Sequence, residues 1–69
     1  MMEGVLEGLL YVQGDNGLTL SEVMSILSLS EEEAKKLVYQ LKRRYEEEDR
    51  GLRIHYLGNT FKLTTKEEH

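Results

Sequence analysis

The sequence predicts an α+β domain in which three helices are followed by a two-stranded β-hairpin. Apolar residues recur at every third or fourth position up to about residue 45, which is the spacing of helices. Over residues 52–65, apolar and polar residues alternate instead, which is the period of a strand. Two Ser/Thr-x-x-Glu motifs, at Thr19 and Ser30, mark the starts of the second and third helices.

The first helix is expected over Met2–Gln13, and its apolar arc is broad. A domain of 69 residues needs only a narrower stripe for its own core. The surplus predicts that this helix also faces a second surface. Its expected members are Val5, Gly8, Leu9 and Val12. Gly4 and Gly8 each weaken a helix by about 1 kcal/mol relative to Ala, a cost that close packing can offset. The simpler interpretation is a central helix of a small core.

Residues 14–17, Gly-Asp-Asn-Gly, have the composition of a turn. The second helix opens at Thr19, where Glu22 completes a capping box. The third helix is expected over residues 30–45, with Ser30 as N-cap and Glu33 reaching back to it. Its buried face is expected to consist of Ala34, Leu37, Val38, Leu41 and Tyr45. Because only three residues separate these two helices, they form a helix-turn-helix pattern.

The hairpin prediction rests on one register that sorts side chains by polarity. Gly58-Asn59 is expected as a two-residue turn of type II′. The expected apolar pairs are Tyr56 with Phe61, Ile54 with Leu63 and Leu52 with Thr65, and the polar pairs are His55 with Lys62 and Arg53 with Thr64. Three helices followed by such a hairpin form the winged-helix layout. We expect residues 1–66 to make up this domain and residues 67–69 to be a tail or the start of a linker.

Composition limits the possible partners and compartments. Nine Lys and Arg stand against 13 Asp and Glu, a net charge of −4 that disfavours bulk DNA or an anionic membrane surface. With no cysteine, neither a disulfide nor a thiolate zinc site is possible. No apolar run approaches the roughly 18 residues that span a bilayer, and no signal peptide is visible. We expect a cytoplasmic protein without a membrane partner.

The sequence offers little for catalysis. Nucleophilic mechanisms need a Ser or Cys beside a positioned base, and the histidines are His55 on a strand and His69 at the end of the chain. His55 is expected on the solvated face of the hairpin. The acidic run at residues 46–49 lacks the spaced ligands and the glycine turn of a calcium loop. We therefore interpret it as a solvated helix end. We expect no enzymatic activity, no cofactor and no metal site.

The exposed face of the third helix is a candidate contact surface. Together with the outer face of the hairpin it gives a patch of Lys36, Tyr39, Arg43, Arg53 and Lys62. In a DNA-reading winged helix this helix enters the major groove with its N-terminal residues. Here those residues are Glu31, Glu32 and Glu33, whose carboxylates repel phosphates. A Tyr between cations is typical of protein interfaces, although its ring can also simply lie along Arg43 in solvent. A protein-contact patch is favoured, and a DNA-binding winged-helix transcription regulator is the alternative.

Several stretches of the chain resemble one protein family. They are VLEGLLYVQG from Val5, Leu18-Thr19, ILSLSEEE from Ile26, YEEEDRGL from Tyr45 and FKLTTK from Phe61. Together they resemble the N-terminal region of segregation and condensation protein B, ScpB. The turn at residues 14–17 departs from that family, in which a Gly-Glu-Pro-like segment is expected.

The resemblance implies a non-enzymatic subunit of the bacterial SMC condensin complex, associated with the nucleoid through that complex. Proteins of this family carry two winged-helix domains, dimerise largely through the first and clasp the kleisin subunit ScpA. This chain is then expected to be the first domain alone, acting as a homodimer with ScpA and SMC as partners. His69 is expected to be either native or part of a purification tag.

Overall fold

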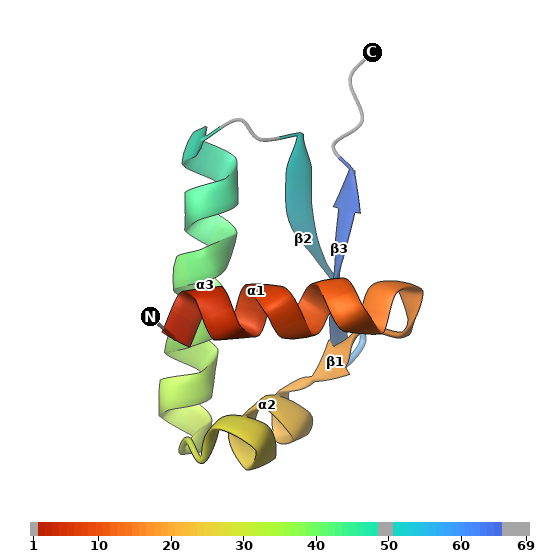
Figure 1. Ribbon diagram of the computed structural model, residues 1–69. Helices are drawn as coiled ribbons and strands as arrows, with labels where there is room; N and C mark the ends of the chain where they lie inside the picture. Colours follow the sequence, from red (N-terminus) through yellow and green to blue (C-terminus); the bar gives the residue numbers. More distant parts are fainter. Residues whose placement is uncertain (1, 49–50, 66–69) are drawn as a thin grey trace.

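The computed structural model describes residues 2–48 and 51–65. In chain order its elements are α1 (Met2–Gln13), the 3₁₀ turn η1 (Gly14–Asn16), β1 (Leu18–Thr19), α2 (Leu20–Leu27), α3 (Glu31–Glu48), β2 (Leu52–Leu57) and β3 (Thr60–Thr65). Figure 1 shows α1 crossing in front of α3 and the sheet, with α2 below. The α+β prediction of three helices and a hairpin is confirmed. The expected boundary at residue 66, the tail and His69 lie outside the described residues.

Both helix starts are fixed by local hydrogen bonds. The Glu22 amide donates to Thr19 Oγ1 at 3.1 Å, and the Thr19 amide donates to Glu22 Oε1 at 2.8 Å. Ser30 and Glu33 form the same reciprocal pair at 3.1 and 2.9 Å. Each box satisfies amides that have no partner inside the helix. Both predicted capping boxes are therefore confirmed, and α3 continues past Tyr45 to Glu48.

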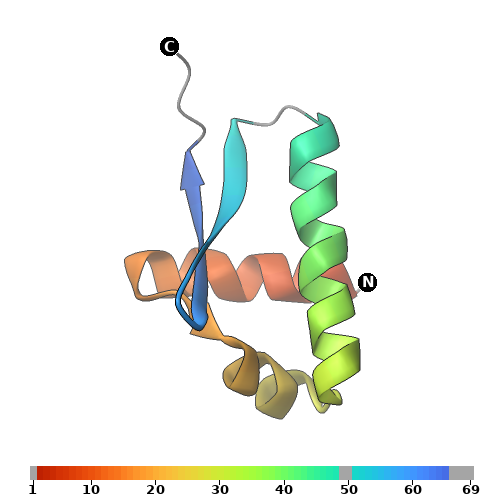
Figure 2. The same cartoon turned by 180° about the vertical axis from the view of Figure 1, so that it is seen from behind.

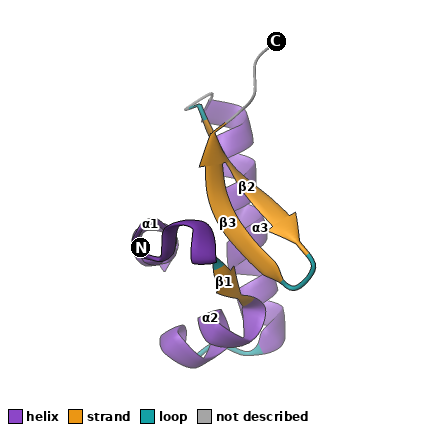
Figure 3. Cartoon of the chain, turned by 90° about the vertical axis from the view of Figure 1, so that its right-hand side faces the viewer, coloured by secondary structure: helices purple, strands orange, loops and turns teal. Residues whose placement is uncertain are grey.

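The predicted hairpin register is confirmed pair by pair, from Leu52 opposite Thr65 to Tyr56 opposite Phe61. The prediction of a two-stranded sheet, however, is incomplete, because a further strand joins the hairpin. Strand β1 pairs antiparallel with β3, so the sheet of the described residues has three strands in the order β1-β3-β2 (Figure 3). A strand of two residues shows no alternation of its own in the sequence, so only its pairing with β3 reveals it.

Gly17 makes the pairing of β1 with β3 possible. Its φ is +69°, in the left-handed region that favours glycine. A Cβ atom there would lie 2.6 Å from Thr60 Cγ2 and 2.8 Å from the Phe61 carbonyl oxygen. The predicted turn at residues 14–17 therefore also makes a close contact with β3 through Gly17.

The core lies where the three helices meet the sheet. Figure 2 shows these elements from behind. Its buried members are Leu6, Leu10, Leu18, Val23, Ala34, Leu37, Leu41, Tyr45, Ile54 and Phe61. Two polar contacts join α1 to α3 at its margin. The Tyr45 hydroxyl donates to the Glu7 carboxylate, and Arg44 Nη1 donates to Glu3 Oε1 at 2.9 Å. These contacts link α1 to α3 beside the core, whereas buried Leu6 and Leu10 mark the side of α1 that faces inward.

Candidate functional site

The structure offers interaction surfaces as its candidate sites. Within the described residues no three His, Asp or Glu side chains are grouped so that they could hold a metal ion. Among the same residues no polar or charged residue is buried, and no helix combines the length and apolar character needed to cross a membrane. His55 lies in a shallow hollow with Asp15, Leu57, Thr60 and Lys62 at the hairpin. It is partly exposed there, on the polar face that the register predicts.

The first surface is the outer face of α1. Leu6 and Leu10 point into the core with no exposed area, whereas Val5 is 51% exposed and Val12 is 83% exposed. Leu9 is half-buried and packs against the core from the edge of this face. In Figure 1 α1 is the element nearest the viewer, and Figure 3 agrees that no other described element covers it on that side. Three of the four predicted interface residues are thus exposed on one face.

The glycines of α1 make no close packing contact with the part of the chain that the structure describes. A Cβ atom added at Gly4 or Gly8 would meet nothing within 4 Å. Glycine in a helix interior costs about 1 kcal/mol relative to Ala, and nothing in the described fold offsets that cost. Gly8 is exposed on the same side of the helix as Val5 and Val12. The outer face of α1 is therefore apolar and free of projecting side chains at two positions.

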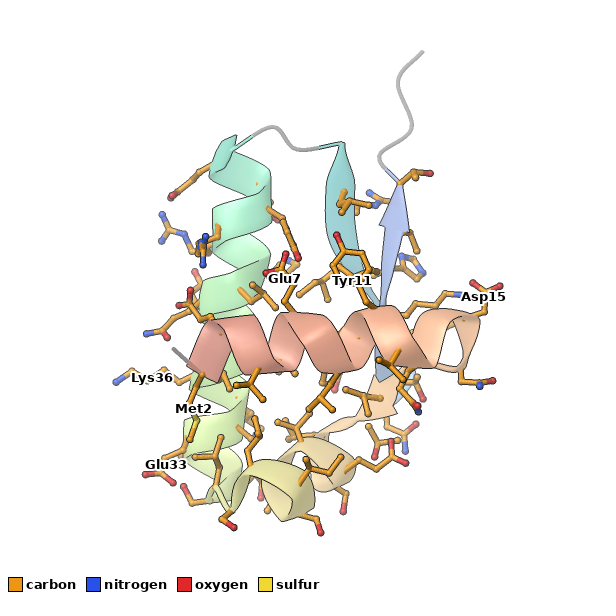
Figure 4. The ribbon with its side chains drawn as sticks, in the orientation of Figure 1. Met2, Glu7, Tyr11, Asp15, Glu33 and Lys36 are labelled. Carbon is orange, nitrogen blue, oxygen red and sulfur yellow. The ribbon has the colours of Figure 1, made fainter. Side chains whose placement is uncertain are left out.

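The second surface is the outer face of α3, where part of the predicted contact patch comes together. Lys36, Tyr39 and Arg43 line one hollow. Figure 4 shows Lys36 pointing away from the body of the molecule. The other two members lie apart on the hairpin: Lys62 lines the hollow that contains His55, and Arg53 is exposed on β2. The structure thus divides the five predicted residues between two places.

Charges on the outer face of α3 are largely compensated. Arg43 Nη2 donates to Glu47 Oε2 at 2.8 Å. The hydrogen bond to the Glu47 carboxylate, together with one to Tyr39, raises the pKa of Arg43 above its ordinary value, so the guanidinium stays charged. Glu31, Glu32 and Glu33 fill the first turn of the helix. Carboxylates therefore stand beside the cations that would otherwise attract an anionic partner.

A third feature, which the sequence did not indicate, is a groove between α3 and the hairpin. It is open, holds about 320 Å³ and is lined by Leu20, Lys35, Val38, Tyr39, Lys42, Ile54, Tyr56 and Phe61. Tyr56 stacks at a tilt on Phe61, with ring centroids 6.1 Å apart, and yet is 59% exposed. The hairpin register did predict that Tyr56 shares a face with Phe61. The groove itself depends on the distance between α3 and β2, which no local pattern encodes.

Comparison with known proteins places the chain in a family. The model for the segregation and condensation complex subunit ScpB matches residues 4–69. Segregation and condensation protein B of Geobacillus kaustophilus is 40% identical over 67 residues, which cover 97% of this chain and 31% of that protein. The protein of Oceanobacillus iheyensis is 42% identical over 67 residues, covering 97% and 35%. The chain thus spans about a third of the length of these curated relatives.

A solved structure agrees with these relatives. The crystal structure of a dimer of the ScpB N-terminal domain complexed with an ScpA peptide matches with a TM-score of 0.92 and 40% identity. The match covers 99% of this chain and 78% of that chain. The winged-helix prediction and the resemblance in the sequence are both confirmed. The chain belongs to the ScpB family of segregation and condensation complex subunits.

Proposed function

We propose that this chain is a non-catalytic dimerisation and scaffold domain of a bacterial chromosome segregation and condensation subunit, acting with SMC and the kleisin ScpA. Its relatives carry the name of that subunit, and the similar solved domain is a dimer with an ScpA peptide. In this proposal residues 1–66 form the domain, which works in the cytoplasm at the nucleoid. In this proposal, the subunit's contacts with SMC and ScpA that this domain does not make belong to the parts of the relatives that this chain does not span.

The outer face of α1 is the observation that carries the proposal. Val12 is 83% exposed and Val5 is 51% exposed on a face with no covering element among the described residues. Exposed apolar side chains that share one face of a helix can form the apolar patch of a protein–protein contact. Exposed Gly8 lets a second helix approach closely, and half-buried Leu9 links the face to the core. A second copy of the chain fits a self-complementary surface of this type.

Molar mass in solution tests the dimer. Light scattering behind a sizing column, over a concentration series, is expected to give about twice 8.0 kDa at the highest concentrations. A mass that stays near 8.0 kDa throughout contradicts self-association through this domain.

The alternative function, a DNA-binding transcription regulator, is favoured by one observation: Lys36, Arg43 and Arg44 line a common hollow on α3. The net charge of −4 and the acidic first turn of α3 oppose it. Duplex DNA titrated at about 50 and 200 mM salt separates the two. A phosphate-binding protein loses affinity steeply between these concentrations, whereas a scaffold domain shows no such binding at either.

A further inference from the structure

Tyr11 extends the outer face of α1 beyond the residues that the sequence indicated. It is 59% exposed, and among the described residues its ring stacks on no other aromatic side chain. Figure 4 shows Tyr11 on the upper side of α1, whereas Met2 projects from the lower side. Large exposed aromatic side chains are frequent anchors of protein contacts. Tyr11 is therefore a candidate contact residue that the predicted surface lacked.

Gly8 lies at the centre of this outer face. At about 100° per residue, Tyr11 and Gly4 lie on one flank of it, about 60° and 40° around the helix. Val12 and Val5 lie on the other flank, at about 40° and 60°. All five residues are exposed. One flank thus carries the largest side chain of the face at one end and no side chain at the other, while the second flank carries a valine at each end.

A second copy can lie on this face in two symmetric ways. If the two helices run parallel, each residue meets the opposite flank of the second copy, so Tyr11 faces a valine and Gly4 faces the other valine. The contact is then crowded at one end and loose at the other. If the helices run antiparallel, each residue meets the same flank of the second copy from its other end. Tyr11 then faces Gly4, and Val5 faces Val12, so that a large side chain meets an open position and the two valines meet each other.

We propose that two copies of the chain pack their α1 helices antiparallel, with Gly8 at the two-fold axis and each Tyr11 ring against Gly4 of the other copy. A Cβ added at Gly4 or Gly8 meets nothing within 4 Å in a single copy, so both positions are open to a partner. Antiparallel helices also place the positive end of each dipole beside the negative end of the other. The proposal rests on the proposed function, since it specifies how the dimer is built and adds Tyr11 to its contact.

Disulfide formation tests the orientation, because the chain has no cysteine of its own. Val5→Cys and Val12→Cys chains are mixed in equal amounts in a glutathione buffer, and mass spectrometry separates the mixed disulfide from the two homodimers. Antiparallel packing should give mainly the mixed disulfide. At 1.5 Å rise per residue, the cysteines of a homodimer are then about 9 or 12 Å apart along the axis, beyond the reach of about 7 Å of a disulfide. A preference for homodimers, or a random mixture of the three products, overturns the proposal.

Exchange of side-chain size between Tyr11 and Gly4 tests their contact. Tyr11→Ala is expected to raise the dimer dissociation constant at least about tenfold, as loss of an anchoring tyrosine does. Gly4→Leu should weaken the dimer as well, because it occupies the place of the ring. The double variant Tyr11→Ala/Gly4→Leu again sets a large side chain against a small one, so it should dimerise more tightly than either single variant. Leu57→Ala removes an equally exposed apolar side chain from the hairpin and should leave the constant unchanged.

The outcomes separate the packing from the function. Sedimentation equilibrium measures each constant, and circular dichroism checks that each variant keeps its fold. If the losses of the two single variants add in the double variant, Tyr11 and Gly4 do not face each other. If the unaltered chain dimerises and Tyr11→Ala dimerises equally well, the packing is wrong while self-association stands. An unaltered chain that stays monomeric contradicts both.

Discussion

The two sides of α1 carry similar residues and have opposite environments. Leu6 and Leu10 have no exposed area, whereas Val5 and Val12, on the same helix, are 51% and 83% exposed. Residue type did not decide which of them is buried; the direction that α3 and the sheet approach from did. The described residues of a single copy cover one stripe of the apolar arc. In the proposed dimer a second copy buries the remaining stripe.

The outer face of α3 differs from the outer face of α1 in being charged. On it Arg43 lies 2.8 Å from the Glu47 carboxylate. The outer face of α1 has no comparable charge at Val5, Gly8 or Val12. This contrast leads to four substitutions whose effects should differ in size and kind.

Leu10→Ala, on the inner side of α1, should destabilise the folded monomer. Removing a fully buried leucine loses its transfer free energy and leaves a cavity, so the free energy of unfolding should fall by about 2–5 kcal/mol. Urea denaturation at a protein concentration low enough to keep the chain monomeric measures this. Val12→Ala is the control, and equal losses in the two variants would remove the distinction between the sides.

Val12→Glu, on the outer side of α1, should weaken the dimer and leave the fold of the monomer unchanged. A carboxylate buried in an apolar contact is costly, so the dimer dissociation constant should rise at least about tenfold, while the circular dichroism spectrum stays unchanged. Sedimentation equilibrium measures the constant. Lys62→Glu, which makes the net charge more negative by two units where Val12→Glu makes it more negative by one, is the control for added negative charge and should leave the dimer intact. Leu9→Glu is a poorer probe, because half-buried Leu9 also packs on the core. A dimer that survives Val12→Glu would place the interface elsewhere.

Gly8→Ala should act in opposite directions on monomer and dimer. The added methyl meets nothing within 4 Å in the monomer and improves helix propensity, so the monomer should gain about 1 kcal/mol. If a second helix packs closely against Gly8, the dimer should weaken at the same time. Denaturation of dilute protein and sedimentation of concentrated protein give the two values. If Gly8→Ala strengthens the dimer as well as the monomer, the backbones of two α1 helices do not approach closely at Gly8.

Arg43→Ala should have the smallest effect of the four substitutions, both on stability and on the dimer. Its pair with Glu47 is exposed on both sides, and exposed pairs of this spacing contribute little. The urea midpoint should stay within experimental error of the unaltered chain, and the mass in solution should not change. A clear loss of the dimer in this variant would move the interface from α1 to α3.

Most of the secondary structure could be predicted because its causes are local. The capping pairs Thr19–Glu22 and Ser30–Glu33 each span three residues, and both formed as expected. The hairpin register followed from alternation around the turn at residues 58–59. Of the candidate site, the exposed position of Val5, Gly8 and Val12 was predictable from the excess width of the apolar arc.

Tertiary structure decided the rest, because the contacts involved join segments far apart in the chain. Pairing of β1 with β3 needs Gly17 to approach Thr60 and Phe61. The packing of Leu6 and Leu10 on α3 and the sheet decides which apolar residues of α1 face outward. The hydrogen bonds of Glu3 with Arg44 and of Glu7 with Tyr45 also join α1 to α3. The groove beside β2 exists only at the separation that α3 and the hairpin adopt when both pack on one core. Sequence patterns report the faces of single elements, whereas surfaces shared between elements depend on how those faces meet.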